Sequence, residues 1–115
     1  MHMLNSFKKI EWTAHSQIKM KQYGLSKSKL IRLLQKPERK EQGIVPGTMA
    51  VMVSGKLRIA NSKWQKRPPG EIWLMYKDAK NSRRIISAWR YPGISKPGEE
   101  IPMPKDVKDE ILKHG

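Results

Sequence analysis

The chain has 115 residues, and its 24 Lys and Arg side chains outnumber its 10 Asp and Glu side chains, which gives a net charge of +14. A chain of this length has room for one domain. It has no cysteine, which excludes disulfide bonds and thiolate metal sites. Charged residues within 7–11 interrupt any signal-like apolar core, and no apolar run approaches the roughly 20 residues that span a bilayer. We therefore expect a cytoplasmic protein with no membrane partner.

The positive charge is unevenly distributed. Residues 1–98 carry 21 basic and 5 acidic side chains, whereas residues 99–115 carry 3 basic and 5 acidic ones. We predict one basic domain over 1–98 and a Pro-rich acidic tail with a short helix over 99–115, either part of the same domain or loosely docked. So positive a field attracts polyanions, and each neutralised phosphate releases counterions. An acidic membrane or protein would also be attracted, but basic residues alternate with aromatic ones and no amphipathic membrane helix is visible, which favours nucleic acid.

The N-terminal third predicts a strand and two helices. Residues 8–13 alternate apolar and polar side chains, as a strand with one buried face does. Residues 15–22 suit two turns of helix that stop at Gly24. Ser26 is a good N-cap for a second helix, which Pro37 terminates.

The second helix combines an apolar stripe with a cationic face. The cations Lys29, Arg32 and Lys36 recur at i, i+3 and i+7. Such a helix can pack on a sheet and offer its outer side to phosphates, or the cations can form an ordinary solvated surface. The sequence leaves both interpretations open.

The rest of the chain predicts a sheet and a terminal helix. In chain order we expect a polar connection at 38–47, a buried strand at 49–53, a hairpin turn at 54–56, a strand at 57–60, a basic loop at 61–70, strands at 71–77 and 83–91, and a short helix that opens at Pro104. Together these elements predict an α+β fold in which two N-terminal helices pack on one face of an antiparallel sheet of about four to five strands. The other face is then free for a ligand.

No metal centre or cofactor is expected. The histidines His2, His15 and His114 are scattered, and no cysteine or carboxylate cluster accompanies them. A Gly-rich phosphate loop and a nucleophile elbow are also missing from the sequence, so it supports neither a nucleotide-dependent enzyme nor an α/β-hydrolase.

The remaining pattern suits cleavage of RNA without a metal. In that reaction the neighbouring 2′-hydroxyl is the nucleophile, so the site needs a base, an acid for the leaving oxygen, and cations for the extra negative charge. Histidine exchanges protons near neutral pH, and Lys19 follows His15 at i+4 on the same helix face. His15 can equally be a helix-start or core histidine.

The strand at 83–91 supplies candidate phosphate ligands. Strict alternation places Arg84 and Arg90 on one face, and Ser87 and Trp89 on the other. Two arginines without partners are too costly to bury, so they must reach solvent, phosphates or carboxylates. Glu71 on the neighbouring strand is the obvious carboxylate that could pair with one of them. The adjacent Tyr91 can stack on a base or pack in the core; for Trp89 we favour the core.

The loop at 61–70 places one tryptophan among cations. Trp64 has Lys63, Lys66 and Arg67 beside it. An aromatic surface with basic neighbours is typical of single-strand binding, although Trp64 can equally fold over the edge of the core.

Residues 15–37, with the matching positions His15, Met20, Gly24, Leu25, Ser26 and Pro37, resemble a motif of a prokaryotic family of unknown-function domains. That family is grouped with RelE- and BrnT-like toxins in the barnase-like ribonuclease superfamily. The strands EIWLMYKD and RRIISAWR are similar to the closing strands of such toxins, and the resemblance covers about residues 10–91. Lys21 and Gln22 depart from the family pattern, which often has an acid and an arginine there. The loop around Trp64 and the tail after Gly93 lie outside the match.

The resemblance implies an active-site set of His15, Arg84, Ser87 and Arg90. It implies a metal-independent endoribonuclease of the toxin type, acting on RNA such as mRNA on the ribosome, with an acidic antitoxin as partner. The alternative is a non-catalytic RNA- or ribosome-binding module on the same scaffold. A DNA-binding regulator ranks last, because no recognisable DNA-reading motif is present. The residues that we expect to bind nucleic acid are Lys19, Lys29, Arg32, Lys36, Trp64, Lys66, Arg67 and Tyr91.

Overall fold

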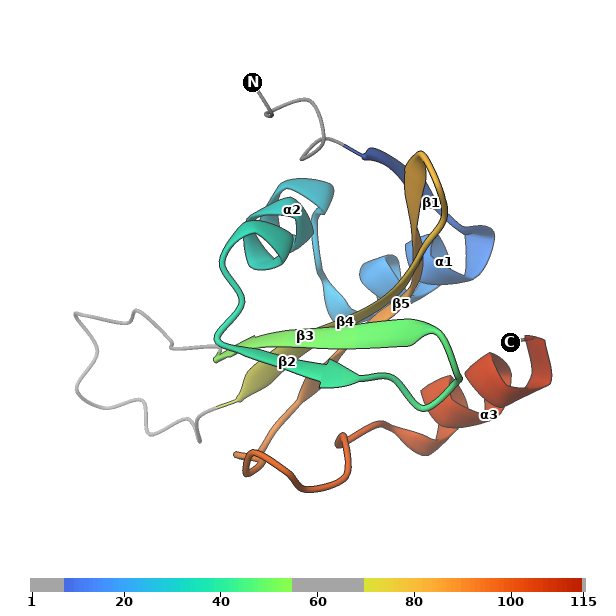
Figure 1. Ribbon diagram of the computed structural model, residues 1–115. Coiled ribbons are helices and arrows are strands. Elements are labelled where there is room, and N and C mark those ends of the chain that lie inside the picture. The colour runs from blue at the N-terminus through green and yellow to red at the C-terminus, as the bar shows by residue number, and fades with distance from the viewer. Residues whose placement is uncertain (1–7, 55–69, 115) are drawn as a thin grey trace.

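The computed structural model describes residues 8–54 and 70–114, and these form an α+β fold with three helices and a mixed five-stranded sheet (Figure 1). In chain order the elements are β1 (Lys9–Trp12), α1 (Ala14–Tyr23), α2 (Lys27–Gln35), β2 (Arg39–Gln42), β3 (Thr48–Ser54), β4 (Glu71–Asp78), β5 (Ser82–Tyr91) and α3 (Lys105–His114). The strand predicted at 57–60 and the loop around Trp64 lie outside the described residues. Among those that are described, no helix is long and apolar enough to cross a membrane.

The two N-terminal helices begin and end where the sequence predicts. The Thr13 side chain caps α1 by accepting a hydrogen bond from the Ser16 amide, and Ser26 caps α2 in the same way. At the end of α1, Gly24 adopts the left-handed conformation with φ of 66°, which a residue with a side chain rarely adopts. The Leu25 amide then donates to the Met20 carbonyl at 2.8 Å, which closes the helix as a Schellman motif.

The sheet has the strand order β1-β5-β4-β3-β2. All pairs are antiparallel except β1 with β5, which is parallel, so the prediction of an antiparallel sheet is wrong at this edge. No hairpin fixes the pairing of β1, since its partner lies some seventy residues later in the chain. The short strand β2 was also missed, because its RKEQ sequence has no apolar alternation. Charged side chains are common on such an edge strand, where they discourage pairing with other chains.

The first face of the sheet packs against α1 and α2. Along β4, the side chains of Ile72, Leu74 and Tyr76 alternate onto this face. They join Leu30 and Leu33 of α2 in one buried cluster. This layer agrees with the prediction that the N-terminal helices cover one face.

The second face is covered by the C-terminal segment, so the prediction of a face free for a ligand is wrong. Trp73 and Trp89 lie side by side on this face, with parallel rings 6.3 Å apart. Ile101, Val107 and Ile111 bury themselves against them. Figure 1 shows α3 and the chain that precedes it below the sheet, opposite α2. The segment after residue 98 therefore contributes Ile101, Val107 and Ile111 to the packed core, and the core packing predicted for Trp89 is confirmed.

A β-bulge in β5 rearranges the faces of the last strand. Met75 pairs with Ser87 but Tyr76 pairs with Ile85, which leaves Ile86 as an extra residue. On either side of it, Arg84 pairs with Lys77 and Arg90 pairs with Ile72. Because Ile72 and Lys77 belong to opposite faces of β4, the two arginines also lie on opposite faces. Strict alternation, which placed them together, is wrong at this bulge.

Candidate functional site

A cavity of about 210 Å³ opens where the start of α1, the paired ends of β4 and β5, and α3 meet. Its walls come from parts of the chain that are far apart in sequence: Thr13, His15, Lys77, Arg84, Ile86, Glu110 and Ile111. Two residues of the predicted active-site set, His15 and Arg84, line it directly. A third, Ser87, forms a hydrogen bond with His15.

Thr13 fixes the start of α1 to the bulge of β5. Its hydroxyl donates to the Ile85 carbonyl at 2.9 Å, and the same oxygen accepts from the Ser16 amide at 3.1 Å. One side chain thus caps the helix and satisfies a carbonyl beside the bulge. This double contact determines where the first turn of α1, and with it His15, lies against the sheet.

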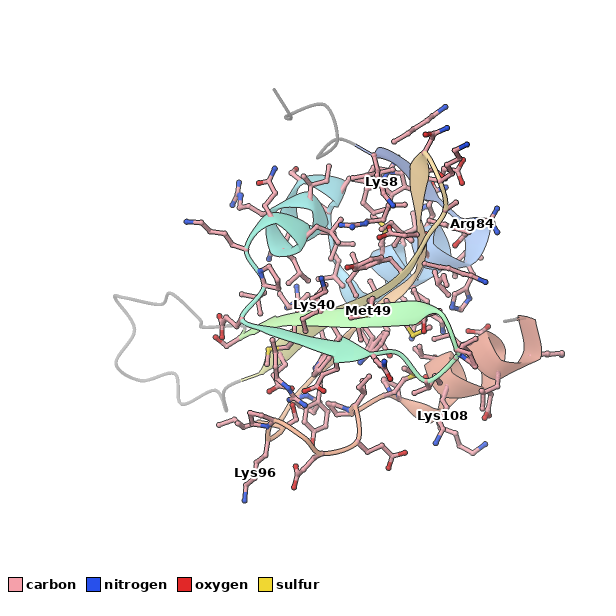
Figure 2. The ribbon with its side chains drawn as sticks, viewed as in Figure 1. Lys8, Lys40, Met49, Arg84, Lys96 and Lys108 are labelled. Atoms are coloured by element: carbon pink, nitrogen blue, oxygen red, sulfur yellow. The ribbon has the colours of Figure 1, made fainter. Side chains whose placement is uncertain are left out.

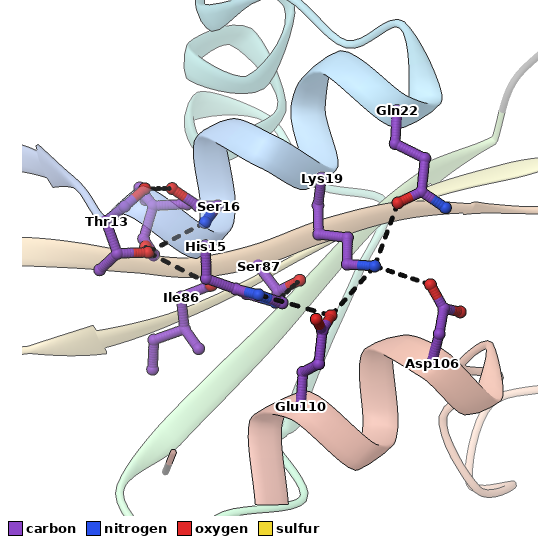
Figure 3. A network of polar contacts seen from close by, with 10 residues as sticks. Thr13, His15, Ser16, Lys19, Gln22, Ile86, Ser87, Asp106 and Glu110 are labelled. Atoms are coloured by element: carbon purple, nitrogen blue, oxygen red, sulfur yellow. Dashed lines mark hydrogen bonds and ion pairs between the residues drawn. The ribbon is translucent and has the colours of Figure 1, made fainter. Parts of the chain in front are cut away.

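The imidazole of His15 lies between two polar groups (Figure 3). Its Nε2 is 3.1 Å from the Ser87 hydroxyl, and its Nδ1 is 3.6 Å from Oε1 of Glu110. The order serine–histidine–carboxylate is that of a nucleophilic triad, but the Ser87 side chain is 0% exposed and cannot reach a substrate. We therefore infer that Ser87 orients the His15 ring. His15 and Glu110 are then the groups at the cavity that can exchange protons.

Lys19 lies one helical turn after His15 and is only 4% exposed. Its ammonium contacts two carboxylates of α3, Asp106 at 2.7 Å and Glu110 at 3.0 Å, and donates to Gln22 (Figure 3). Burial alone would lower the pKa of Lys19, but these hydrogen bonds and charges raise it overall. The hydrogen bond from Lys19 lowers the pKa of Asp106. Lys19 is thus buried and paired, and the prediction that it binds nucleic acid does not fit its position.

Two cations face each other at the mouth of the cavity. Lys77 and Arg84 are directly opposite partners of the β4–β5 ladder. The Arg84 side chain is 62% exposed, and it forms an ion pair with Glu11 at 3.8 Å. Like charges in opposite positions of a ladder repel each other, and an anion between them would relieve that repulsion. Figure 2 shows Arg84 at the opposite end of the molecule from Lys96.

Arg90 and Tyr91 are not brought to this cavity. The Arg90 guanidinium donates to the carbonyls of Tyr23 and Gly24, at 2.7 and 3.4 Å. Tyr23 ends α1 and Gly24 follows it directly, so Arg90 caps the C-terminal end of that helix. Tyr91 packs against the second-face cluster and lines a separate cavity of about 390 Å³ beside Lys108. The buried carboxylate of Glu71, which was a candidate partner for one of the two arginines, accepts hydrogen bonds from Trp73 and Ser95.

The other predicted nucleic-acid ligands lie elsewhere. Lys29 and Arg32 are exposed on α2, and Lys36 is exposed at its C-cap, across the sheet from α3. Trp64, Lys66 and Arg67 lie outside the described residues.

Two charged residues of the cavity, Glu110 and Lys77, were not among the predicted site residues. Glu110 belongs to the tail, which the charge distribution separated from the basic domain. A helix period over residues 105–114 does place Asp106 and Glu110 on one face, but nothing in the sequence shows what that face meets. Lys77 ends a clearly predicted strand, and an antiparallel register with the next strand would have placed it opposite Arg84.

Comparison of the chain with protein-family models, with curated proteins and with solved structures finds no match. Within residues 8–54 and 70–114, no group of three or more His, Cys, Asp and Glu side chains is arranged to hold a metal ion.

Proposed function

We propose that the protein binds RNA and cleaves it as a metal-independent endoribonuclease, with the cavity beside His15 as its active site. The observation that carries this proposal is the meeting of His15 and Glu110, 3.6 Å apart, with the cationic pair Lys77 and Arg84 in one cavity. Proton-exchanging groups beside two cations are what phosphodiester cleavage requires. The net charge of +14 favours a polyanionic substrate.

In this reaction the 2′-hydroxyl attacks the adjacent phosphorus, and the bond from phosphorus to the 5′-oxygen of the next nucleotide breaks. Either His15 or Glu110 takes the proton from the 2′-hydroxyl, and the other gives a proton to the leaving 5′-oxygen. Lys77 and Arg84 stabilise the additional negative charge on the phosphate oxygens. The products are a 2′,3′-cyclic phosphate and a 5′-hydroxyl, and the step needs no oxidant or reductant.

The proposal is tested by incubating the purified protein with end-labelled RNA in low salt and EDTA and resolving the products on a gel. We expect discrete fragments that end in a 2′,3′-cyclic phosphate. His15→Ala should reduce the cleavage rate at least about 100-fold, because a general acid–base group contributes roughly 10²–10⁴-fold. Lys96→Met removes one positive charge far from the cavity and serves as the matched control. Cleavage at the wild-type rate by His15→Ala would exclude this active site.

A non-catalytic RNA- or ribosome-binding module is the second candidate function. The exposed cations Lys29 and Arg32 of α2, with Lys36 at its C-cap, favour it, because they offer a binding surface away from the cavity. Intact RNA that still shifts in a native gel would support this function over cleavage. In either case, an acidic antitoxin would find its complement in the cationic surface around the cavity.

A further inference from the structure

We propose that Lys19 is a positioning residue that holds the Glu110 carboxylate beside His15, so that the C-terminal helix supplies part of the active site. This inference rests on the proposed ribonuclease function. It gives Lys19 a role other than the contact with nucleic acid that the sequence predicts.

The burial of Lys19 is the first reason. At 4% exposure its charge must be paired, because an unpaired buried ammonium is strongly destabilising. Both of its carboxylate partners come from α3, at 2.7 and 3.0 Å. Asp106 and Glu110 are four residues apart, so they lie on one face of that helix. One ammonium on α1 therefore fixes two successive turns of α3.

The geometry of Glu110 is the second reason. Its side chain is 45% exposed, yet its Oε1 atom is turned inward, 3.0 Å from Lys19 and 3.6 Å from His15. A half-exposed glutamate would otherwise be free to turn its carboxylate to water, where it has many rotamers. The contact with Lys19 selects the rotamer that faces the histidine.

Docking of α3 does not depend on Lys19 alone. Val107 and Ile111 are 0% and 2% exposed and pack against the second face of the sheet. Apolar contact holds the helix in place, while Lys19 sets the direction of one of its side chains. The two contributions can therefore be separated by mutation.

Four variants separate positioning from docking: Lys19→Met, Glu110→Gln, the double variant, and Asp106→Asn as the control. Asp106→Asn weakens the same ion-pair cluster without changing the group at His15. We expect Lys19→Met to lower kcat about 10- to 100-fold, part of the acid–base contribution, with KM nearly unchanged. Asp106→Asn should lower Tm but change kcat by less than about threefold. Because Lys19 acts through Glu110, the double variant should have a kcat less than about threefold below that of Glu110→Gln alone.

A second measurement does not require cleavage. The Glu110 carboxylate faces Nδ1 at 3.6 Å, and the Ser87 hydroxyl lies 3.1 Å from Nε2, to which it can donate. We therefore expect the neutral His15 ring to carry its proton on Nδ1. The ¹⁵N chemical shifts of the ring nitrogens report this tautomer directly. We expect it in the wild type and in Asp106→Asn, and its loss in Lys19→Met and Glu110→Gln.

The outcomes distinguish the two proposals. A wild-type protein that leaves RNA intact would refute the proposed function, while the tautomer series would still decide whether Lys19 positions Glu110. An unchanged tautomer in a folded Lys19→Met variant would overturn the positioning role. Equal losses of kcat in Lys19→Met and Asp106→Asn would overturn it too, since both would then act only on docking.

Discussion

Two cationic surfaces of the molecule differ in what surrounds them. Lys77 and Arg84 stand at a cavity that also holds His15 and Glu110. On α2, the exposed cations project from a helix whose remaining face is buried apolar packing, Leu30 and Leu33 among it. Positive charge alone attracts a polyanion to either surface. Only the cavity combines that charge with groups that can move a proton, so we expect chemistry at the cavity and no more than binding on α2.

The largest expected difference between the two surfaces lies in the rate of cleavage. Arg84→Met and Lys77→Met should each reduce the rate about 100-fold, because removing one group that stabilises transition-state charge typically costs roughly 10²–10³-fold. Arg32→Met on α2 should change it by less than about threefold when RNA is saturating. Single-turnover cleavage of end-labelled RNA measures all three variants. Similar losses in Arg84→Met and Arg32→Met would erase the distinction between the surfaces.

Local signals determined the parts of the fold that the sequence could predict. Ser26, Gly24 and Pro37 act within a few residues of their own positions, and α1 and α2 begin and end accordingly. The strands β3, β4 and β5 also lie within a residue or so of their predicted ranges. The parallel pairing of β1 was not predictable in this way, because it depends on contact with a strand distant in the chain.

The site was only half predictable for the same reason. His15 and Arg84 have distinctive chemistry, and they do meet at one cavity. The bulge at Ile86 places Arg90 and Arg84 on opposite faces of the sheet. No residue of the strand predicts that bulge. Glu110 lies at the cavity because apolar side chains of α3 pack against the sheet. The acidic charge of residues 99–115 had instead suggested a separate tail.

The distinction between the surfaces also depends on Thr13, which places His15 at the cavity. Thr13→Val keeps the shape of the side chain but removes the N-cap and the hydrogen bond to Ile85. We expect a loss of about 1–2 kcal/mol in the free energy of unfolding, together with slower cleavage. Thr13→Ser keeps the hydroxyl and should retain most of the stability and most of the cleavage rate. Chemical denaturation and cleavage assays on the two variants measure this, and equal stability of the two would contradict the role of the hydroxyl.

Acid should affect the docking of α3, which carries Glu110 to the cavity, before it affects α2. The hydrogen bond from Lys19 lowers the pKa of Asp106 below its ordinary value of 3.8. The folded state therefore binds fewer protons than the unfolded state, so this ion pair stabilises the fold fully above pH 3.8 and progressively less as the pH falls below it. We expect the NMR signals of Val107 and Ile111 to shift in this range while those of Leu30 and Leu33 stay constant. In Asp106→Asn this part of the pH dependence should disappear; its persistence would assign the transition to another carboxylate.

The smallest expected effect is on the salt dependence of RNA binding by α2. If Arg32 contacts a phosphate, Arg32→Met should weaken binding only a few-fold and reduce the slope of log K against log salt by about one contact. Lys96→Met, at the far end of the molecule from Arg84, again provides a matched loss of one charge and should leave the slope closer to that of the wild type. Measuring both in a His15→Ala background keeps the RNA intact during the titration. If Arg32→Met and Lys96→Met give the same slope, α2 contributes only its share of the overall charge, and the cavity is then the only one of the two surfaces with a specific role.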